Sequence, residues 1–262
     1  MTDFHTAGPV RLRLSLPAGL AQVTATETER STVEVHAHHD SDKAAHQLAE
    51  QTQVELRGDE LIVEVPRGYR LRRTPELDVR ITLPLGSAVT ATVASADLRA
   101  HGRLGRVQVD SASGDVEIEE ALGEVEIRTA SGDSRVGRCE GRVRVKSASG
   151  NVAVDVAAAG VDVSSASGDV TVGETTGSST ARSASGDFTV RTARSGDIEA
   201  NTASGDVRVG VAAGTGVYLD LSTLSGEAIS HLQPEARPAE GRPELQLRLR
   251  TLSGDIDVVR SG

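Results

Sequence analysis

Aspartates recur at a regular spacing through the middle of this chain, and carboxylates in such an array could bind Ca²⁺. They end a repeated Ser-Gly-Asp tripeptide whose copies mostly lie about 18 residues apart. This column consists of Asp97, Asp115, Asp133, Asn151, Asp169, Asp187, Asp206, Glu227 and Asp255. Glycine–aspartate β-rolls hold Ca²⁺ between successive turns of chain, but they carry Asp on both halves of each turn. Here the other half lacks Asp almost throughout, with Asp197 as the exception, so we expect each carboxylate to cap its own tight turn, with Ca²⁺ binding as the alternative.

Hydroxyl side chains recur at the same spacing and could include a nucleophile. They are Ser111, Thr129, Ser147, Ser165, Ser183 and Thr202. A nucleophilic serine needs a base within hydrogen-bond reach, and the only histidines after residue 50 are His101 and His231. We therefore expect hydroxyls that hydrogen-bond to one another along the column, and we predict no catalytic residue.

Histidines cluster before the repeats, where two imidazoles on one strand face could bind a metal ion. The group comprises His36, His38, His39, Asp40 and His46. Val33 and Val35 alternate with the strand's polar residues and claim its inward face. A solvated strand face is therefore the prediction, with no metal and no cofactor, and the single cysteine, Cys139, has no neighbouring ligand that would give it a role.

The repeat itself predicts an all-β fold, a single-stranded β-solenoid (β-helix) with coils of about 18 residues that spans residues 93–262. Each period contains two glycines and two short apolar pairs, such as Val107/Val109 and Val116/Ile118. This pattern favours two strands and two turns per coil, although three short sides remain possible. A Pro-rich stretch near residues 230–244 predicts a loop insert, because proline interrupts a sheet.

Residues 1–92 lack the repeat but show apolar residues at every second position, as in half-buried strands. Examples are the runs from Val10 to Leu16 and from Leu77 to Leu83. One short helix is expected over residues 41–51, with Ser41 as its cap and with Ala44, Ala45 and Leu48 facing inward. We interpret this region as a β-rich N-terminal cap.

Composition excludes several classes of partner. The formal net charge of the 262 residues is −10, whereas nucleic-acid binding needs clustered Lys and Arg. No apolar run is long enough to span a bilayer, and the first residues lack the pattern of a signal peptide. We therefore expect no nucleic acid, no membrane insertion and a cytoplasmic location.

The Ser-Ala-Ser-Gly-Asp-Val copies, together with an alternating β region that contains Leu83-Pro84-Leu85-Gly86, resemble a bacterial family of adhesin-like β-strand repeats, the domain of unknown function 4097. The likeness runs from about residue 8 to residue 259. It implies a β-solenoid, an adhesin-like role and no established catalytic residues.

These observations favour a non-enzymatic structural or interaction protein that presents a rigid surface to a macromolecular partner, most simply another protein. One alternative is a cytoskeleton-like scaffold that self-associates, and another is a Ca²⁺-binding β-roll. The chain stops soon after a strand-like run at Asp255–Arg260. That run would be an exposed edge. We expect either that the Pro-rich insert folds over it or that it pairs with a second copy in a homodimer through the C-terminal coil, which Val258→Lys would disrupt.

Overall fold

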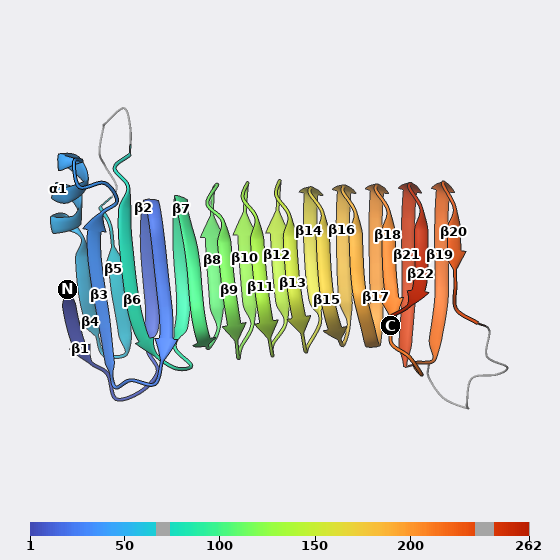
Figure 1. Cartoon of the computed structure of the whole chain (residues 1–262), viewed down its shortest axis with the longest axis horizontal. Helices are drawn as coiled ribbons and strands as arrows, with labels where there is room; N and C mark the ends of the chain where they lie inside the picture. The colour runs from blue at the N-terminus through green and yellow to red at the C-terminus, as the bar shows by residue number, and fades with distance from the viewer. Residues whose placement is uncertain (67–73, 234–243, 262) are drawn as a thin grey trace. The chain divides into compact units, whose positions relative to one another are not determined.

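The computed structural model describes residues 1–66, 74–233 and 244–261, and strands dominate it (Figure 1). The all-β prediction is confirmed. The chain divides into two compact units, Met1–Arg135 and Val136–Gly262. The expected boundary near residue 92 stays a prediction.

In the first unit, the described residues form ten strands and one helix. The strands are β1 (Thr2–His5), β2 (Arg11–Thr26), β3 (Arg30–Ala37), β4 (Gln53–Arg57), β5 (Glu60–Glu64), β6 (Leu77–Pro84), β7 (Ala88–Leu104), β8 (Val107–Ser111), β9 (Val116–Ala121) and β10 (Val125–Thr129). Val89, Val107 and Val125 lie in register on parallel strands β7, β8 and β10. Pairing between residues one period apart is the arrangement expected of a β-solenoid.

Strand β2 lies between β7 on one side and the pair β5 and β6 on the other, parallel to all three. Its inward residues Leu12, Leu14 and Leu16 are buried, as the alternation predicts. Beyond β5 and β6 the pairing becomes antiparallel: β4 pairs with β5, β3 with β6 and β1 with β3.

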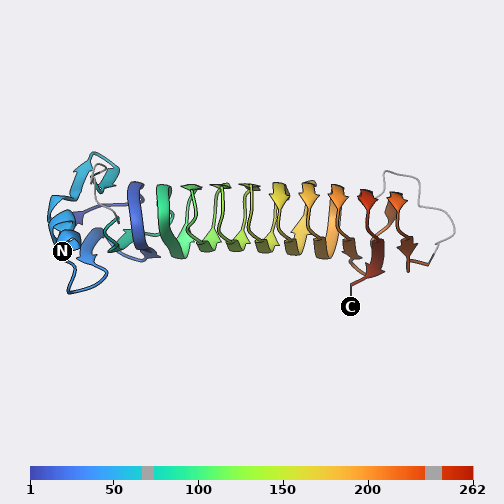
Figure 2. The same cartoon turned by 90° about the horizontal axis from the view of Figure 1, so that it is seen from above.

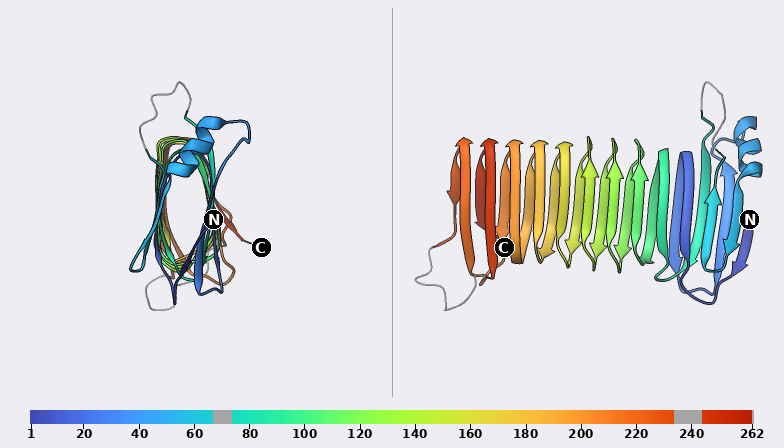
Figure 3. Two further views of the ribbon diagram at one scale, coloured as in Figure 1. Left: turned by 90° about the vertical axis from the view of Figure 1, so that its left-hand side faces the viewer. Right: turned by 180° about the vertical axis from the view of Figure 1, so that it is seen from behind.

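The helix α1 (Lys43–Gln51) forms where the sequence predicts it, and Figure 3 shows it beside the strands of the first unit. Its cap is Asp42 rather than Ser41, because one Asp42 carboxylate oxygen accepts the backbone N–H groups of Ala44 and Ala45. Ala45 and Leu48 are buried as expected, whereas Ala44 is only half-buried.

The strand β11 (Ser134–Cys139) spans the boundary between the units, and the part of the second unit that the structure describes adds eleven strands after it. They are β12 (Val143–Ser147), β13 (Val152–Ala157), β14 (Val161–Ser167), β15 (Val170–Thr176), β16 (Ser179–Ser185), β17 (Phe188–Ser204), β18 (Val207–Val211), β19 (Val217–Ser225), β20 (Ala228–Ser230), β21 (Leu245–Ser253) and β22 (Ile256–Arg260). They form two rows of parallel strands, which Figure 2 shows as two layers. The apolar residues that face between the rows make the core.

The last coils of this unit do not follow chain order. Strand β21 pairs with β17 on one side and β19 on the other, and β22 pairs in the same way with β18 and β20 (Figure 1). The coil made last in the sequence is therefore inserted before the one made by β19 and β20. The physical reason is its apolar content: its inward residues Ile256 and Val258 are fully buried, whereas β20 offers only Ala228 and Ser230 at the aligned positions.

This order corrects the prediction for the C-terminal edge. Val258 has no exposed surface, and β22 lies between two strands, so it is not an edge. The expected Pro-rich insert falls mostly on residues 234–243, which lie outside the described residues. No helix among the described residues has the length and apolar content needed to cross a membrane.

Candidate functional site

The aspartate column forms a ladder of hydrogen bonds, but not the bonds expected from the sequence. The side-chain oxygens of Asp97, Asp115, Asn151, Asp169, Asp187, Asp206 and Asp255 accept the backbone N–H of the corresponding residue in the adjacent coil, not an N–H of their own turn. In the first unit the Asp115 N–H donates to Oδ1 of Asp97 at 3.0 Å, and the Asp133 N–H donates to Oδ1 of Asp115 at 2.8 Å. The prediction that each carboxylate caps its own turn was wrong, because the amide that it binds belongs to the adjacent coil. The prediction that backbone amides bind these carboxylates was right.

In the second unit the ladder begins at Asn151, whose Oδ1 accepts from Asp169 at 3.0 Å. It continues through Asp187, Asp206 and Asp255, and it ends at the N–H of Glu227, which donates to Asp255 at 2.8 Å. Asn151 serves as well as Asp because an amide oxygen is an equivalent acceptor. An amide donor on each of these carboxylates stabilises its negative charge and so opposes the repulsion between stacked carboxylates.

The hydroxyl column also differs from expectation. The hydroxyls donate to backbone carbonyls of the nearby turn instead of to one another. Thr129 donates to Ser131 O at 2.8 Å, Ser165 to Ser167 O at 2.9 Å and Ser183 to Ser185 O at 2.9 Å. These bonds hold the turns, which is a structural role.

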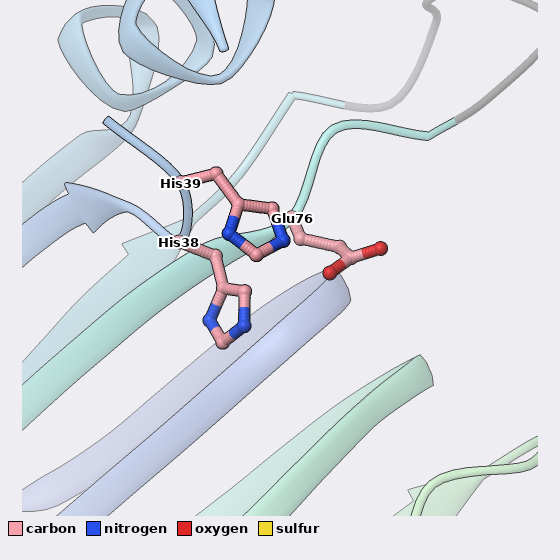
Figure 4. A group of neighbouring side chains, drawn as sticks. All are labelled: His38, His39 and Glu76. Atoms are coloured by element: carbon pink, nitrogen blue, oxygen red, sulfur yellow. The ribbon is translucent and has the colours of Figure 1, made fainter. Parts of the chain in front are cut away.

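The histidine group separates into two parts. His36, Asp40 and His46 line one hollow beside α1, and Nε2 of His46 lies 3.0 Å from the Asp40 carbonyl oxygen. His38 and His39 instead lie together with Glu76, which sequence analysis did not include (Figure 4). Glu76 is distant in sequence and precedes β6, which pairs antiparallel with β3, so only this pairing brings it to the histidines.

The His38–His39–Glu76 group offers one ligand atom from each residue, and the three atoms lie within 4.8 Å of one another. The two imidazole rings are T-shaped with centroids 4.7 Å apart. Nδ1 of His38 lies 2.7 Å from Oδ1 of Asp78. This hydrogen bond, together with the negative charge of Asp78, raises the pKa of His38 above its ordinary value.

Cys139 is buried, and its thiol donates a hydrogen bond to the Gly141 carbonyl oxygen, with an Sγ···O distance of 3.3 Å. A small apolar side chain would fill the same place. The structure adds nothing that would give this thiol a chemical role.

The β19–β20 edge, defined as Val217–Ser225 together with Ala228–Ser230, is the terminal coil of the second unit in space. Three of its apolar side chains are conspicuously exposed: Tyr218 at 55%, Leu224 at 83% and Ile229 at 44%. Leu224 lies between Thr223 and Ser225, which are aligned with Thr251 and Ser253 of β21, so it is the neighbour of Leu252, itself 58% exposed. Earlier copies of the repeat have Ala at this position, as in Ala184 and Ala203.

A hollow of about 300 Å³ lies beside this edge. Its lining includes four aspartates, Asp187, Asp206, Asp255 and Asp257, as well as Arg208 and His231. Arg208 donates from Nε to Oδ2 of Asp257 at 3.1 Å. Oδ1 of Asp257 is buried without a hydrogen-bond partner in the described part of the chain, and Nε2 of His231 is 3.5 Å from it.

Parallel coils, a carboxylate–amide ladder and turns held by hydroxyls define an all-β repeat protein. The Toastrack DUF4097 family matches residues 13–259. The chain therefore belongs to this family, which confirms the resemblance noted from its sequence.

Two solved structures share the fold. The first is a putative lipid binding protein from Parabacteroides distasonis, with a TM-score of 0.53 and 13% identity over 99% of this chain and 96% of that one. The second is a putative adhesin from Bacteroides fragilis, with a TM-score of 0.50 and 13% identity over 98% of this chain and 95% of that one. At this identity the likeness concerns the fold alone. No curated protein matches the sequence.

Proposed function

We propose that this protein is a non-enzymatic interaction module, and that it binds an extended segment of another protein along the β19–β20 edge. The segment adds a strand to the sheet and contributes a basic side chain to the acidic hollow. In this proposal the chain is a solenoid of about 18-residue coils, residues 1–92 form its N-terminal cap, and the protein acts in the cytoplasm. The similar fold of the putative adhesin from Bacteroides fragilis is in line with an interaction role.

The observation that carries the proposal is an edge with few features that discourage pairing. Natural edge strands are usually protected by charges, prolines or bulges. From Val217 to Ser230 the only charged residues are Asp220 and Glu227, and there is no proline. Strand addition supplies main-chain hydrogen bonds, and alternate side chains supply specificity.

The core also remains open at this coil. Val217, Leu219 and Leu221 are aligned with buried Leu245, Leu247 and Leu249 of β21, yet each is only half-buried. A strand laid on this edge would cover them, and removal of apolar surface from water stabilises such a complex by roughly 25 cal/mol per Å².

Charge favours a different protein over a second copy. The net charge of −10 makes two copies repel, and the four aspartates of the hollow would be better matched by Lys or Arg. The buried Oδ1 of Asp257 is an acceptor that such a side chain could satisfy.

The test uses a displayed library of extended peptides, selected on the full chain and counter-selected on Tyr218→Lys/Leu224→Lys. We expect the selected peptides to alternate apolar β-formers with polar residues and to contain Lys or Arg. They should slow amide hydrogen exchange in β19 and lose at least tenfold in affinity for the double variant. Leu122→Lys is the matched control, because Leu122 is also an exposed apolar residue (40%) but lies in the first unit.

Peptides that bind the double variant and the wild type equally would contradict the proposal. So would exchange protection confined to other strands. Light scattering separates the remaining alternative: a wild-type dimer that Tyr218→Lys/Leu224→Lys converts to a monomer would assign the edge to self-association.

A further inference from the structure

We propose that His38, His39 and Glu76 bind one divalent transition-metal ion of the Zn²⁺ class. Two imidazole nitrogens and a carboxylate oxygen are the donor set of many three-ligand zinc sites, in which water completes the coordination. Among the described residues this is the one group of three or more such side chains with ligand atoms close enough to converge on an ion. The proposal is independent of the strand-binding edge, which lies in the other unit.

The distances allow coordination after small side-chain rotations. Zinc–ligand bonds of about 2.0–2.1 Å in tetrahedral geometry place two ligand atoms about 3.3 Å apart. The three atoms are now within 4.8 Å, so they must approach by at most about 1.5 Å. Both histidines are exposed and Glu76 is half-buried, so no packed core side chain has to move with them.

The backbone holds the three residues in place. The His38 N–H donates to the Glu76 carbonyl oxygen at 3.0 Å, which extends the β3–β6 ladder by one pair. The His39 carbonyl oxygen accepts the Asp42 N–H at 3.0 Å, and Asp42 in turn caps α1. The loop that carries both imidazoles is therefore anchored on each side, which lowers the entropy lost when an ion binds.

Asp78 completes the arrangement as a positioning residue. It lies 2.7 Å from Nδ1 of His38, so with Nδ1–H donated to Asp78 the lone pair of the imidazole resides on Nε2. Carboxylates that orient ligating histidines in this way raise the basicity of the ligand and tighten metal binding. His36, Asp40 and His46 do not take part, because they line a separate hollow.

A bound ion would tie the loop between β3 and α1 to the segment that enters β6. Its expected effect is to stabilise the first unit, because an ion that binds only the folded state raises stability in proportion to the logarithm of its concentration over Kd. The role is that of a clamp, and no reaction is assigned to it.

The experiment uses the full chain without a polyhistidine tag, freed of metal with a chelator and titrated with ZnCl₂ by calorimetry. One site is expected to disappear in His38→Ala/His39→Ala. Glu76→Gln should weaken that site at least tenfold, and Asp78→Asn about tenfold. The matched control is His36→Ala/His46→Ala, which removes two nearby imidazoles and should leave the site unchanged.

Two further readouts keep the outcome clear. Circular dichroism checks that each variant is folded, and Co²⁺ in place of Zn²⁺ should give the visible absorption of a nitrogen-ligated ion in wild type but not in His38→Ala/His39→Ala. The proposal fails if the wild type binds no Zn²⁺. It also fails if the control double variant loses the site and the His38/His39 variant keeps it.

Discussion

Replacing Gly168 with alanine should destabilise the second unit far more than the same replacement at Gly214, although both glycines have positive φ. Gly168 has φ +113°, and a Cβ there would lie 2.3 Å from the Gly150 carbonyl oxygen of the adjacent coil. Gly214 has φ +78°, and a Cβ there would meet no atom within 4 Å. The pair therefore separates backbone strain from the close approach of stacked coils.

The magnitudes follow from these two terms. At Gly214 the left-handed conformation costs alanine about 1–2 kcal/mol, and reduced freedom of the unfolded chain returns about 0.4–1 kcal/mol, which leaves about 1 kcal/mol. At Gly168 the conformation is almost restricted to glycine and costs about 1–3 kcal/mol. The Gly150 carbonyl must also retreat by about 1 Å, and overpacking of this kind costs about 1–3 kcal/mol. The expected total is about 4 kcal/mol.

The assay is thermal unfolding followed by far-ultraviolet circular dichroism, because the chain has no Trp for fluorescence. At about 2–4 °C per kcal/mol for a chain of this size, Gly168→Ala should lower Tm by about 8–16 °C and Gly214→Ala by about 2–4 °C. Thr171→Val, an outward change on β15, should shift Tm by no more than about 2 °C. Equal shifts for the two glycine variants would refute the stacking argument.

Three further outcomes are expected. Val258→Lys should unfold the second unit, at a cost of about 4 kcal/mol or more, because it buries a charge in a strand paired on both sides. If the variant instead stays folded and light scattering shows only a change in assembly, β22 would be an exposed edge that mediates a homodimer, as the sequence suggested. Asp187→Ala should lower the free energy of unfolding in urea by about 1 kcal/mol, because it leaves the Asp206 N–H without its acceptor. Asp187→Asn keeps an acceptor oxygen and should leave the free energy of unfolding unchanged. A larger loss in the Asn variant than in the Ala variant would mean that the charge matters more than the hydrogen bond. Millimolar Ca²⁺ should not change Tm, because amide donors already bind the ladder carboxylates; a rise of about ten degrees would instead support the β-roll alternative.

The sequence alone determined the repeating part of this protein. Alternation at Leu12 and Leu14, and glycine and Asp in most copies of the repeat, are local requirements of strands, tight turns and stacked coils, and each is visible without knowledge of the partners. The helix was predictable for the same reason, although Asp42 and Ser41 are equivalent cap residues in sequence and only the folded loop selected Asp42.

Tertiary structure decided which coil lies last. Chain order suggested that Asp255–Arg260 would be terminal, but burial of Ile256 and Val258 is worth more than burial of Ala228 and Ser230 at the aligned positions, so the more apolar coil lies inside. One sequence signal was available in hindsight. The ladder carboxylates accept a backbone N–H from the next coil in space. The one copy with Glu in place of Asp, Glu227, lies in the coil that no described coil follows, so it has no such N–H to accept.

The proposed metal site likewise depended on tertiary structure. His38 and His39 are adjacent in sequence, but Glu76 and Asp78 reach them only because β6 returns antiparallel to β3. Sequence analysis placed the imidazoles on an outward strand face and grouped them with His36 and His46. Side chains that are close in sequence need not converge, because alternation along the strand and the turn into α1 direct them to different places.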